Sequence, residues 1–347
     1  MTSSNQHPRT IVVLGSTGSQ GRGVVDSLLH ETNLGSCLIR AVTRNVNSAA
    51  ARQLLHDFQT PDNRLSLVTG DVYNSQSLHD AFRGAYGVFA VTSERTSKRI
   101  EKEEDMKHEL QAGWNIISAA KSCHIQHFVL SSLPNMKEVT AGRFKKIFHM
   151  DNKFIIEQWA KRDLPAVTCL IPGFFFTNLS RPEYCRRENG VVRFCPPIPG
   201  SKSVQWLDPV HDMGVFAASR LHPDLNAVSF APSVFALGIL QTKNKNYVVA
   251  GPKMRMEDFA TIFERVTGQS AIYSPTTMDE WASAASRAVG PGFKEDFCQM
   301  MEWVSIAPDD KICYGALDPA DDHSWNDLHV RASTFEEWLE RTGWTGP

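Results

Sequence analysis

A histidine and a lysine, His149 and Lys153, stand four residues apart in a segment whose pattern is typical of a helix. Four residues turn a helix by about 400°, so both side chains should lie on one face. A histidine can donate a proton near neutral pH because its free pKa is about 6.5. A lysine in this position can hold the ribose of a nicotinamide nucleotide. The pair could support hydride transfer with protonation of the product, whereas a histidine at a helix start can also cap or pack without chemistry.

The usual partner of such a lysine is absent. In reductases built on a nucleotide-binding α/β sheet, a tyrosine four residues before the lysine donates the proton, and the lysine lowers the pKa of its phenol. No tyrosine here has a lysine four residues further on; the tyrosines are Tyr73, Tyr86, Tyr184, Tyr247, Tyr273 and Tyr314. Ser131 and Ser132 end the preceding predicted strand, where such enzymes carry a polar residue. The candidate catalytic residues are therefore Lys153, His149 and Ser132.

The nucleotide is indicated by a glycine-rich turn near the N-terminus. Residues 11–14 are an apolar, β-branched-rich run typical of a buried strand, and a helical apolar pattern follows the turn. Gly15, Gly18 and Gly21 lie between them at three-residue intervals. In a dinucleotide-binding turn, such glycines permit a tight turn, approach of the pyrophosphate and close packing of helix on strand. N–H groups at the helix start would bind the phosphates. The other candidate contacts in this turn are Thr17, Ser19 and Gln20.

The end of the second predicted strand indicates which nucleotide binds. An NAD-preferring site carries an Asp or Glu there, which binds the ribose hydroxyls. Here the planar guanidinium of Arg44 stands in that place and suits the oxygens of a 2′-phosphate. The sequence therefore predicts NADP(H), with a solvated surface arginine as the alternative. Asp71 and Val72, after the third strand, should border the adenine. Thr92, after the fourth, should border the inner half of the cofactor.

These residues would be brought together by an α/β fold with a doubly wound parallel sheet. Strands are predicted at 11–15, 37–43, 65–69, 87–92, 127–131 and 166–171, and helices at 20–31, 48–58, 75–83, 101–122 and 149–163. This alternation predicts parallel strands with right-handed crossovers, whose carboxyl ends bind ligands. We expect a Rossmann domain over residues 8–172, to which a strand near 246–250 returns. A smaller, mixed lobe over residues 173–347 would bind substrate or a partner.

The second half of the chain has a different pattern. Residues 174–207 are rich in aromatic residues, proline and arginine, and the run 195–200 within them is expected to be irregular. Thr277 and Thr334 are each followed three residues later by glutamate, which is typical of a helix start.

Composition limits the class of protein. A net charge of −2 provides no field for nucleic acid or an anionic membrane. No apolar run approaches membrane-spanning length, and the N-terminus lacks the core of a signal peptide. Seven cysteines without a Cys-x-x-Cys pair argue against structural zinc, and we expect no metal site. We therefore expect a cytoplasmic protein, with a nuclear location as the alternative, that acts on a small-molecule substrate. A protein partner and an oligomer remain open.

Together these segments resemble the NmrA-like branch of the atypical short-chain dehydrogenases. The matching pieces keep their order from about residue 10 to 344: the three glycines, 43–45, 70–72, 114–121, 127–132, 149–157, 164–165, 171–178, 208–214 and 334–339. The resemblance implies a Rossmann domain, an NADP(H) site and a smaller C-terminal lobe that closes a cleft. It also extends the cofactor contacts to Pro172 and Phe174.

The resemblance leaves two functions open. Relatives include reductases of quinones, aromatic alkenes or natural-product intermediates, and redox-sensing regulators that bind dinucleotide without turnover and share the missing tyrosine. We expect an NADPH-dependent reductase of a bulky apolar or aromatic molecule, with secondary metabolism as one setting. The alternative is a non-catalytic NADP(H) sensor that binds a protein through its C-terminal lobe. Phe174, Phe175, Phe176 and Trp206 could line an apolar pocket beside the nicotinamide, whereas core packing would explain at least two of them.

Overall fold

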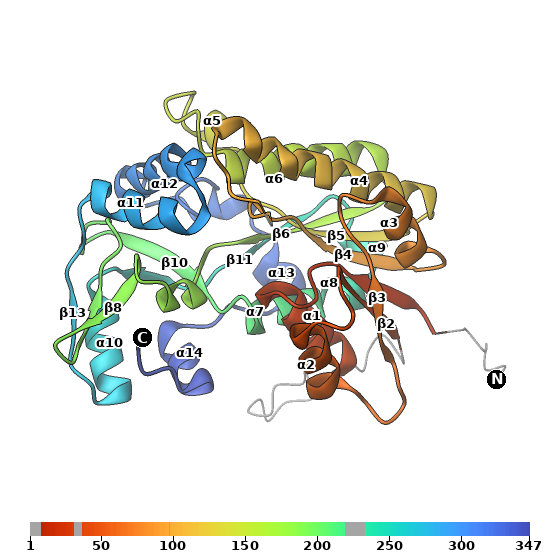
Figure 1. Ribbon diagram of the computed structural model, residues 1–347, viewed down its shortest axis with the longest axis horizontal. Helices are drawn as coiled ribbons and strands as arrows, with labels where there is room; N and C mark the ends of the chain where they lie inside the picture. The colour runs from red at the N-terminus through yellow and green to blue at the C-terminus, as the bar shows by residue number, and fades with distance from the viewer. Residues whose placement is uncertain (1–7, 31–36, 97, 219–232) are drawn as a thin grey trace.

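A seven-stranded parallel sheet, with strands from both halves of the chain, forms the centre of the structure (Figure 1). The structure is a computed structural model that describes residues 8–30, 37–96, 98–218 and 233–347. The strand order of the sheet is β11-β6-β5-β4-β1-β2-β3. The strands are β1 (Thr10–Val13), β2 (Leu38–Thr43), β3 (Leu65–Thr69), β4 (Gly87–Val91), β5 (His127–Ser131), β6 (Val167–Pro172) and β11 (Asn246–Val249). The order reverses between β1 and β4, which is where doubly wound sheets bind ligands. The α/β fold predicted from the alternation is confirmed.

Helices cover both faces of this sheet (Figure 1). One face carries α1 (Ser19–His30), α2 (Ala49–Phe58) and α7 (His211–Ala217), and the other carries α3 (Ser75–Phe82), α4 (His108–Ser122) and α6 (Phe148–Asp163). The predicted helices fall within a residue or two of these bounds, except that residues 101–122 divide into a 3-10 turn, η1 (Glu103–Lys107), and α4. Residue 31, predicted to be helical, lies outside the described residues.

A close helix crossing fixes α7 to the first helix of the sheet domain. A Cβ atom on Gly23 of α1 would lie 1.6 Å from the carbonyl oxygen of Val210, and one on Gly214 of α7 would lie 2.4 Å from Ser27 Oγ. Only glycine permits backbones to approach this closely. The crossing therefore places the start of α7 directly against the helix that follows the glycine turn.

The C-terminal half adds two small sheets and a group of helices. One sheet has the order β12-β10-β7, with β7 (Phe174–Phe175), β10 (Ser203–Leu207) and β12 (Lys253–Arg255). The other has the order β13-β9-β8, with β8 (Cys185–Glu188), β9 (Val191–Phe194) and β13 (Ala271–Tyr273). The helices include α10 (Asp258–Thr267), α11 (Met278–Val289), α12 (Lys294–Ile306) and α14 (Phe335–Thr342); shorter ones are α5 (Met136–Val139), α8 (Val234–Leu237), α9 (Ile239–Thr242) and α13 (Ser324–Leu328). Residues 195–200 lie outside any helix or strand, which confirms the irregular run predicted there. The strands of two to five residues before and after it are too short to show a period of two.

The helix starts predicted in the second half are confirmed. Thr277 and Thr334 each accept a hydrogen bond from the backbone N–H of the glutamate three residues later, whose side chain accepts one in return. No helix in the described ranges is long and apolar enough to cross a membrane.

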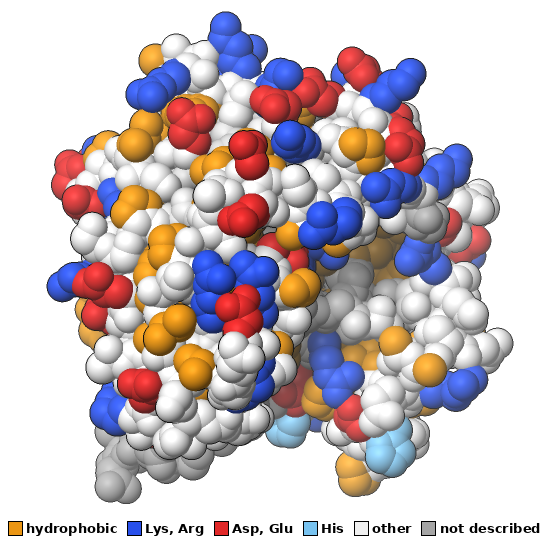
Figure 2. All heavy atoms as spheres, turned by 60° about the vertical axis from the view of Figure 1, so that its left-hand side comes forward, with side chains coloured by type: hydrophobic (Ala, Val, Ile, Leu, Met, Phe, Trp, Pro, Cys, Tyr) orange, Lys and Arg blue, Asp and Glu red, His pale blue; other side chains and the backbone are white. Residues whose placement is uncertain are grey.

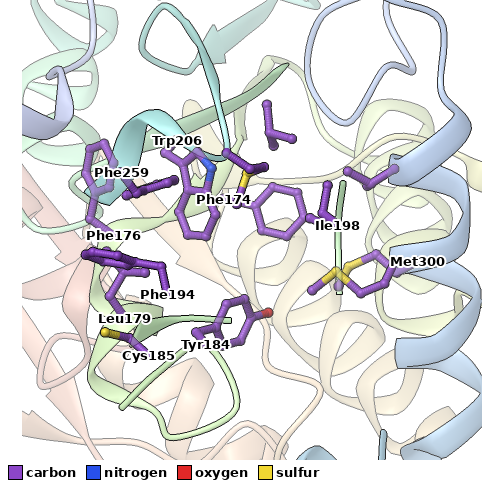
Figure 3. Packing of buried hydrophobic residues seen from close by; sticks show 14 of the residues in the cluster. Phe174, Phe176, Leu179, Tyr184, Cys185, Phe194, Ile198, Trp206, Phe259 and Met300 are labelled. Carbon is purple, nitrogen blue, oxygen red and sulfur yellow. The ribbon is translucent and has the colours of Figure 1, made fainter. Parts of the chain in front are cut away.

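The aromatic residues proposed to line a pocket lie mainly in the core of this half (Figure 3). Phe174, Phe176 and Trp206 are each at most 3% exposed. The Phe174 and Trp206 ring centroids are 5.0 Å apart, and Phe176 packs on Trp338 at 5.5 Å. Core packing therefore explains three of the four residues.

Candidate active site

The three glycines of the N-terminal turn have three different surroundings. Gly15 has a φ of +65°, and a Cβ atom there would lie 2.6 Å from a methyl group of Val91. A Cβ atom on Gly21 would lie 2.3 Å from the carbonyl oxygen of Gly15. On Gly18 the nearest atom would be that same oxygen at 3.3 Å, and the residue is exposed. Gly15 therefore makes the turn, Gly21 allows helix and strand to pack, and Gly18 leaves an open backbone surface.

This open surface continues into the first turn of α1. Thr17 and Ser19 are exposed beside Gly18, and the Gln20 side-chain oxygen is buried without a hydrogen-bond partner among the described residues. Ser16, which sequence reasoning did not single out, donates a hydrogen bond of 2.8 Å to the carbonyl oxygen of Val42 and so fixes the turn to β2. A cradle of exposed N–H groups at a helix start fits a pyrophosphate.

The residues predicted to border the adenosine half lie together at the ends of β2 and β3. Arg44 is exposed and makes no hydrogen bond or ion pair with any residue that the structure describes. Its charge reaches Tyr73: burial and nearby carboxylates raise the pKa of that phenol, and Arg44 opposes them. Asp71 accepts a hydrogen bond of 3.0 Å from the Tyr73 N–H, and the carbonyl oxygen of Val72 accepts one of 2.9 Å from Asn115. An available guanidinium thus stands beside the carboxyl ends of β2 and β3.

Lys153 is buried in an ion-pair network rather than open to solvent. Its Nζ lies 2.7 Å from Glu109 Oε1, 3.3 Å from the carbonyl oxygen of His149 and 3.6 Å from Glu94 Oε2. Burial acts to lower the pKa of Lys153, but Glu109 and Glu94 outweigh it and raise that pKa above its ordinary value. For Glu94, burial acts upward, yet Lys153 and His149 lower its pKa to about 2. The lysine and Glu94 therefore both carry charge at neutral pH.

Thr92 supports this network from the end of β4. Its side chain is buried, and its hydroxyl donates a hydrogen bond of 2.7 Å to the same Glu109 oxygen that binds Lys153. The second oxygen of Glu109 is buried without a partner among the described residues. In this structure Thr92 therefore contacts Glu109, the carboxylate that binds Lys153.

His149 is held by a carboxylate from the C-terminal half of the chain. Its Nδ1 lies 2.5 Å from Oδ1 of Asp296 on α12, and its backbone N–H donates to Oδ2 at 2.9 Å. Asp296 is fully buried, and the His149 side chain is 13% exposed. Burial acts to lower the pKa of His149, but the charge and hydrogen bond of Asp296 outweigh it and raise that pKa. His149 and Lys153 do lie on one face of α6, since the lysine Nζ reaches the histidine carbonyl.

The remaining candidates serve the packing around the site. Ser132 is fully buried, and its hydroxyl donates a hydrogen bond of 3.4 Å to the carbonyl oxygen of Lys153, so it positions α6. The Phe174 side chain is enclosed between Trp206 and Tyr314, at ring distances of 5.0 and 4.6 Å. Pro172 is buried beside β11. Any cofactor contact at these last two positions would come from the main chain.

Sequence reasoning missed Glu94, Glu109 and Asp296. Glu109 stands in the first turn of α4 and Asp296 in the first turn of α12, where acidic residues are common because they favour the helix dipole. Glu94 follows β4 by only three residues, and an acidic residue at that carboxyl end was the one available signal.

Figure 2, in which the C-terminal half of the chain comes forward, shows a hollow in the surface with Lys and Arg side chains at its border and hydrophobic atoms inside it.

Comparison with known proteins gives consistent matches. The model of the NmrA-like family matches residues 7–339. The NmrA-like family domain-containing oxidoreductase FrzB of Cladobotryum sp is 26% identical over 279 residues, which cover 76% of this chain and 75% of that protein. The structure of NmrA, a negative transcriptional regulator, in complex with NAD has a TM-score of 0.66 at 18% identity, covering 98% of this chain and 93% of that one. The Citrobacter sp. triphenylmethane reductase complexed with NADP(H) has a TM-score of 0.65 at 17% identity, covering 96% and 99%.

Proposed function

The chain belongs to the NmrA-like family, and from that premise we propose that it is an NADP(H)-dependent reductase of a bulky apolar or aromatic small molecule. The observation that carries this proposal is a charged cluster beside the carboxyl ends of β4 and β5, in which Lys153, Glu109 and Asp296 are buried, His149 is 13% exposed and Glu94 is 28% exposed. Buried ion pairs contribute little net stability. Their concentration at the ligand-binding edge of the sheet, with raised pKa values on both cations, favours a role in chemistry.

The cofactor-binding residues of this proposal follow from the exposed surfaces. The N–H groups of Thr17 and Ser19 would hold the pyrophosphate, while the Gly18 N–H between them donates to the Gly15 carbonyl oxygen at 2.9 Å. Arg44 would bind the 2′-phosphate. The bound cofactor supplies the hydride. FrzB is named an oxidoreductase and the Citrobacter enzyme a reductase with NADP(H), which supports the same assignment here.

Lys153 and His149 have separate roles in this proposal. The Lys153 contact with Glu94 at 3.6 Å is the longest of its three, so a ribose hydroxyl could take its place without breaking the pair with Glu109. Asp296 engages Nδ1 of His149, which leaves Nε2 to donate a proton to the reduced substrate. The raised pKa keeps more of this histidine protonated near neutral pH than a free histidine would be.

Oxidation of NADPH in the presence of quinones, conjugated ketones and aromatic alkenes tests the proposal. The variant His149→Gln keeps a group that can bond Asp296 but cannot act as the acid. We expect turnover to fall by about 10² to 10⁴ while the Kd for NADPH, measured by calorimetry, stays unchanged.

The lysine needs a matched pair of variants. Lys153→Met alone would leave Glu109 buried without its cation, which destabilises a fold by about 3–5 kcal/mol. The informative comparison is therefore Glu109→Gln against Glu109→Gln with Lys153→Met. We expect the second to bind NADPH more weakly and to turn over more slowly than the first.

Binding of NADPH without oxidation by any of these compounds would count against the reductase. That result would favour the alternative, a non-catalytic NADP(H) sensor.

A further inference from the structure

Two tyrosines beside the charged cluster have hydroxyl groups without a protein acceptor. Tyr184 lies directly before β8, and Tyr314 lies in the loop after α12. Neither phenol oxygen makes a hydrogen bond to any residue in the described ranges. Tyr184 is buried and Tyr314 half-buried, and neither phenol oxygen is among the buried polar atoms that lack a partner, so each still reaches solvent. A hydroxyl at the accessible tip of a packed ring can bind a ligand there.

The surrounding structure holds both rings in place. Tyr184 is 4% exposed, and its ring meets the edges of Trp206 at 6.3 Å and Trp281 at 5.9 Å. The Tyr314 ring lies 4.6 Å from that of Phe174. Packing of this kind would present each hydroxyl in one direction.

The backbone at Tyr314 is also strained. Cys313 and Tyr314 have φ values of 47° and 59°, in the left-handed region that residues other than glycine seldom adopt. Two hydrogen bonds of 2.8 Å hold this turn: the Cys313 N–H donates to Gln205, and the Trp303 ring N–H donates to the Tyr314 carbonyl oxygen. Strain of this kind persists where the surroundings impose it, which is common at ligand-binding sites.

Both phenols lie near the charged cluster. Burial raises the pKa of each tyrosine, and the charge of Glu94 adds to that effect in both. Glu94 is also the carboxylate 3.6 Å from Lys153. The charge of Glu94 therefore acts both on the Lys153 amine and on the two phenols. In Figure 3 the Tyr184 oxygen points away from Cys185, toward the space between Phe174 and Met300.

We propose that Tyr184 and Tyr314, the phenol pair, donate hydrogen bonds to an oxygen of the substrate on the side of the site away from His149 and Lys153. This inference rests on the proposed function and narrows its substrate class. The substrate would be an extended apolar or aromatic molecule with a second oxygen acceptor besides the group that is reduced, as in a quinone or a diketone.

The charges around the phenol pair favour a neutral acceptor. Phenols with raised pKa values stay protonated and donate. Arg181 and Arg95 lower the pKa of Tyr184 while Glu183 and Glu94 raise it, so charges of both signs act on this phenol. A neutral carbonyl oxygen can accept from a phenol without any net charge at the site.

The test compares a probe that has two carbonyl oxygens with one that has a single carbonyl oxygen: a dimethyl-naphthoquinone, whose substituted ring resists attack by thiols, and the corresponding dimethyl-tetralone, whose ketone ring is otherwise saturated. Steady-state NADPH oxidation gives kcat/KM for each, and calorimetry gives the Kd of the quinone. Tyr184→Phe and Tyr314→Phe each keep the ring and remove one donor. We expect each to lower quinone affinity and kcat/KM about tenfold, as for the loss of one hydrogen bond, and to leave the tetralone values unchanged.

Tyr273→Phe is the matched control, because its hydroxyl already donates to the Ile198 carbonyl oxygen at 2.6 Å. We expect it to leave the discrimination between the probes intact. Equal losses for both probes, no loss in either variant, or no binding of the quinone to the parent protein would overturn the inference. Binding that depends on the phenol pair without NADPH oxidation would support it while counting against the proposed reductase.

Discussion

Replacing Asp296 with asparagine separates the charge of this residue from its shape. In the parent protein, Asp296 approaches His149 Nδ1 to 2.5 Å and accepts from its backbone N–H at 2.9 Å. Asparagine can keep one of these hydrogen bonds but carries no charge. The burial that lowers the pKa of His149 would then be unopposed by Asp296, and Lys153 lowers that pKa further, while Glu94 still raises it. We expect His149 in Asp296→Asn to be largely neutral at neutral pH.

The substitution of Asp296 should change the pH dependence of activity in a defined direction. A reaction that needs protonated His149 proceeds fully below the pKa of this group and slows as the pH rises through it. That pKa is above 6.5 in the parent, so the falling limb of kcat/KM lies on the alkaline side. In Asp296→Asn the limb should move to lower pH. A hydrogen bond to a charged group contributes about 1.5–3 kcal/mol, so the rate above neutral pH should fall by about one to two decades.

The assay is NADPH oxidation across the neutral range, with NADPH affinity measured separately. Asp327→Asn is a suitable control, since that carboxylate accepts from Tyr247 at 2.8 Å and lies outside the cluster. Superimposable pH profiles for Asp296→Asn and the parent would refute the assignment of His149 as the acid.

The same variant has a stability readout that does not depend on turnover. The pKa of His149 is higher in the folded state than its unfolded value of 6.5. The pair therefore contributes stability that is complete below about pH 6.5 and is lost as the pH rises through the folded-state pKa. Urea unfolding should show this loss in the parent and not in Asp296→Asn.

Three further outcomes follow from the structure. Arg44→Ala should weaken NADPH binding by about one to two decades and leave NADH unchanged; equal losses in calorimetry would contradict the 2′-phosphate assignment. Gly18→Val should reduce cofactor binding with little change in melting temperature, whereas Gly21→Val should lower the melting temperature, because its Cβ atom would lie 2.3 Å from the Gly15 carbonyl oxygen. Burial lowers the pKa of His127 from 6.5 to about 4, so stability present above pH 6.5 is lost as the pH falls toward 4. Urea unfolding of the parent should lose about 2 kcal/mol at pH 5 from this residue, and His127→Leu should remove that loss.

Most of the sheet domain could be predicted from the sequence because its signals are local. Each strand is a short apolar run and each helix has its own periodicity, so alternation alone predicts the parallel order. The glycine turn could also be predicted, since its three glycines lie within seven residues, and close approach of neighbouring atoms requires two of them, Gly15 and Gly21. The C-terminal half has fewer local sequence signals of this kind. Its strands have only two to five residues. The sequence around Phe174, Phe176 and Trp206 also cannot distinguish aromatic residues that line a pocket from aromatic residues that fill a core.

Even less of the candidate site could be predicted from the local sequence. That His149 and Lys153 share a face follows from their spacing, but what surrounds them does not. Glu109 precedes Lys153 by 44 residues, and Asp296 follows His149 by 147. Each would pass for an ordinary acidic residue at a helix start. Only burial distinguishes them, and burial is a property of the packed chain.

The position of Asp296 also links the two halves of the molecule in the chemistry. His149 begins α6 of the sheet domain, and α12 of the C-terminal half supplies the carboxylate that raises its pKa. Without α12, the histidine would lose both bonds from Asp296. The phenol pair comes from the same half, so the proton donor and the proposed substrate contacts both depend on its packing. A change that loosens α12 should therefore lower turnover and substrate affinity together, while NADPH binding at the glycine turn and Arg44 persists.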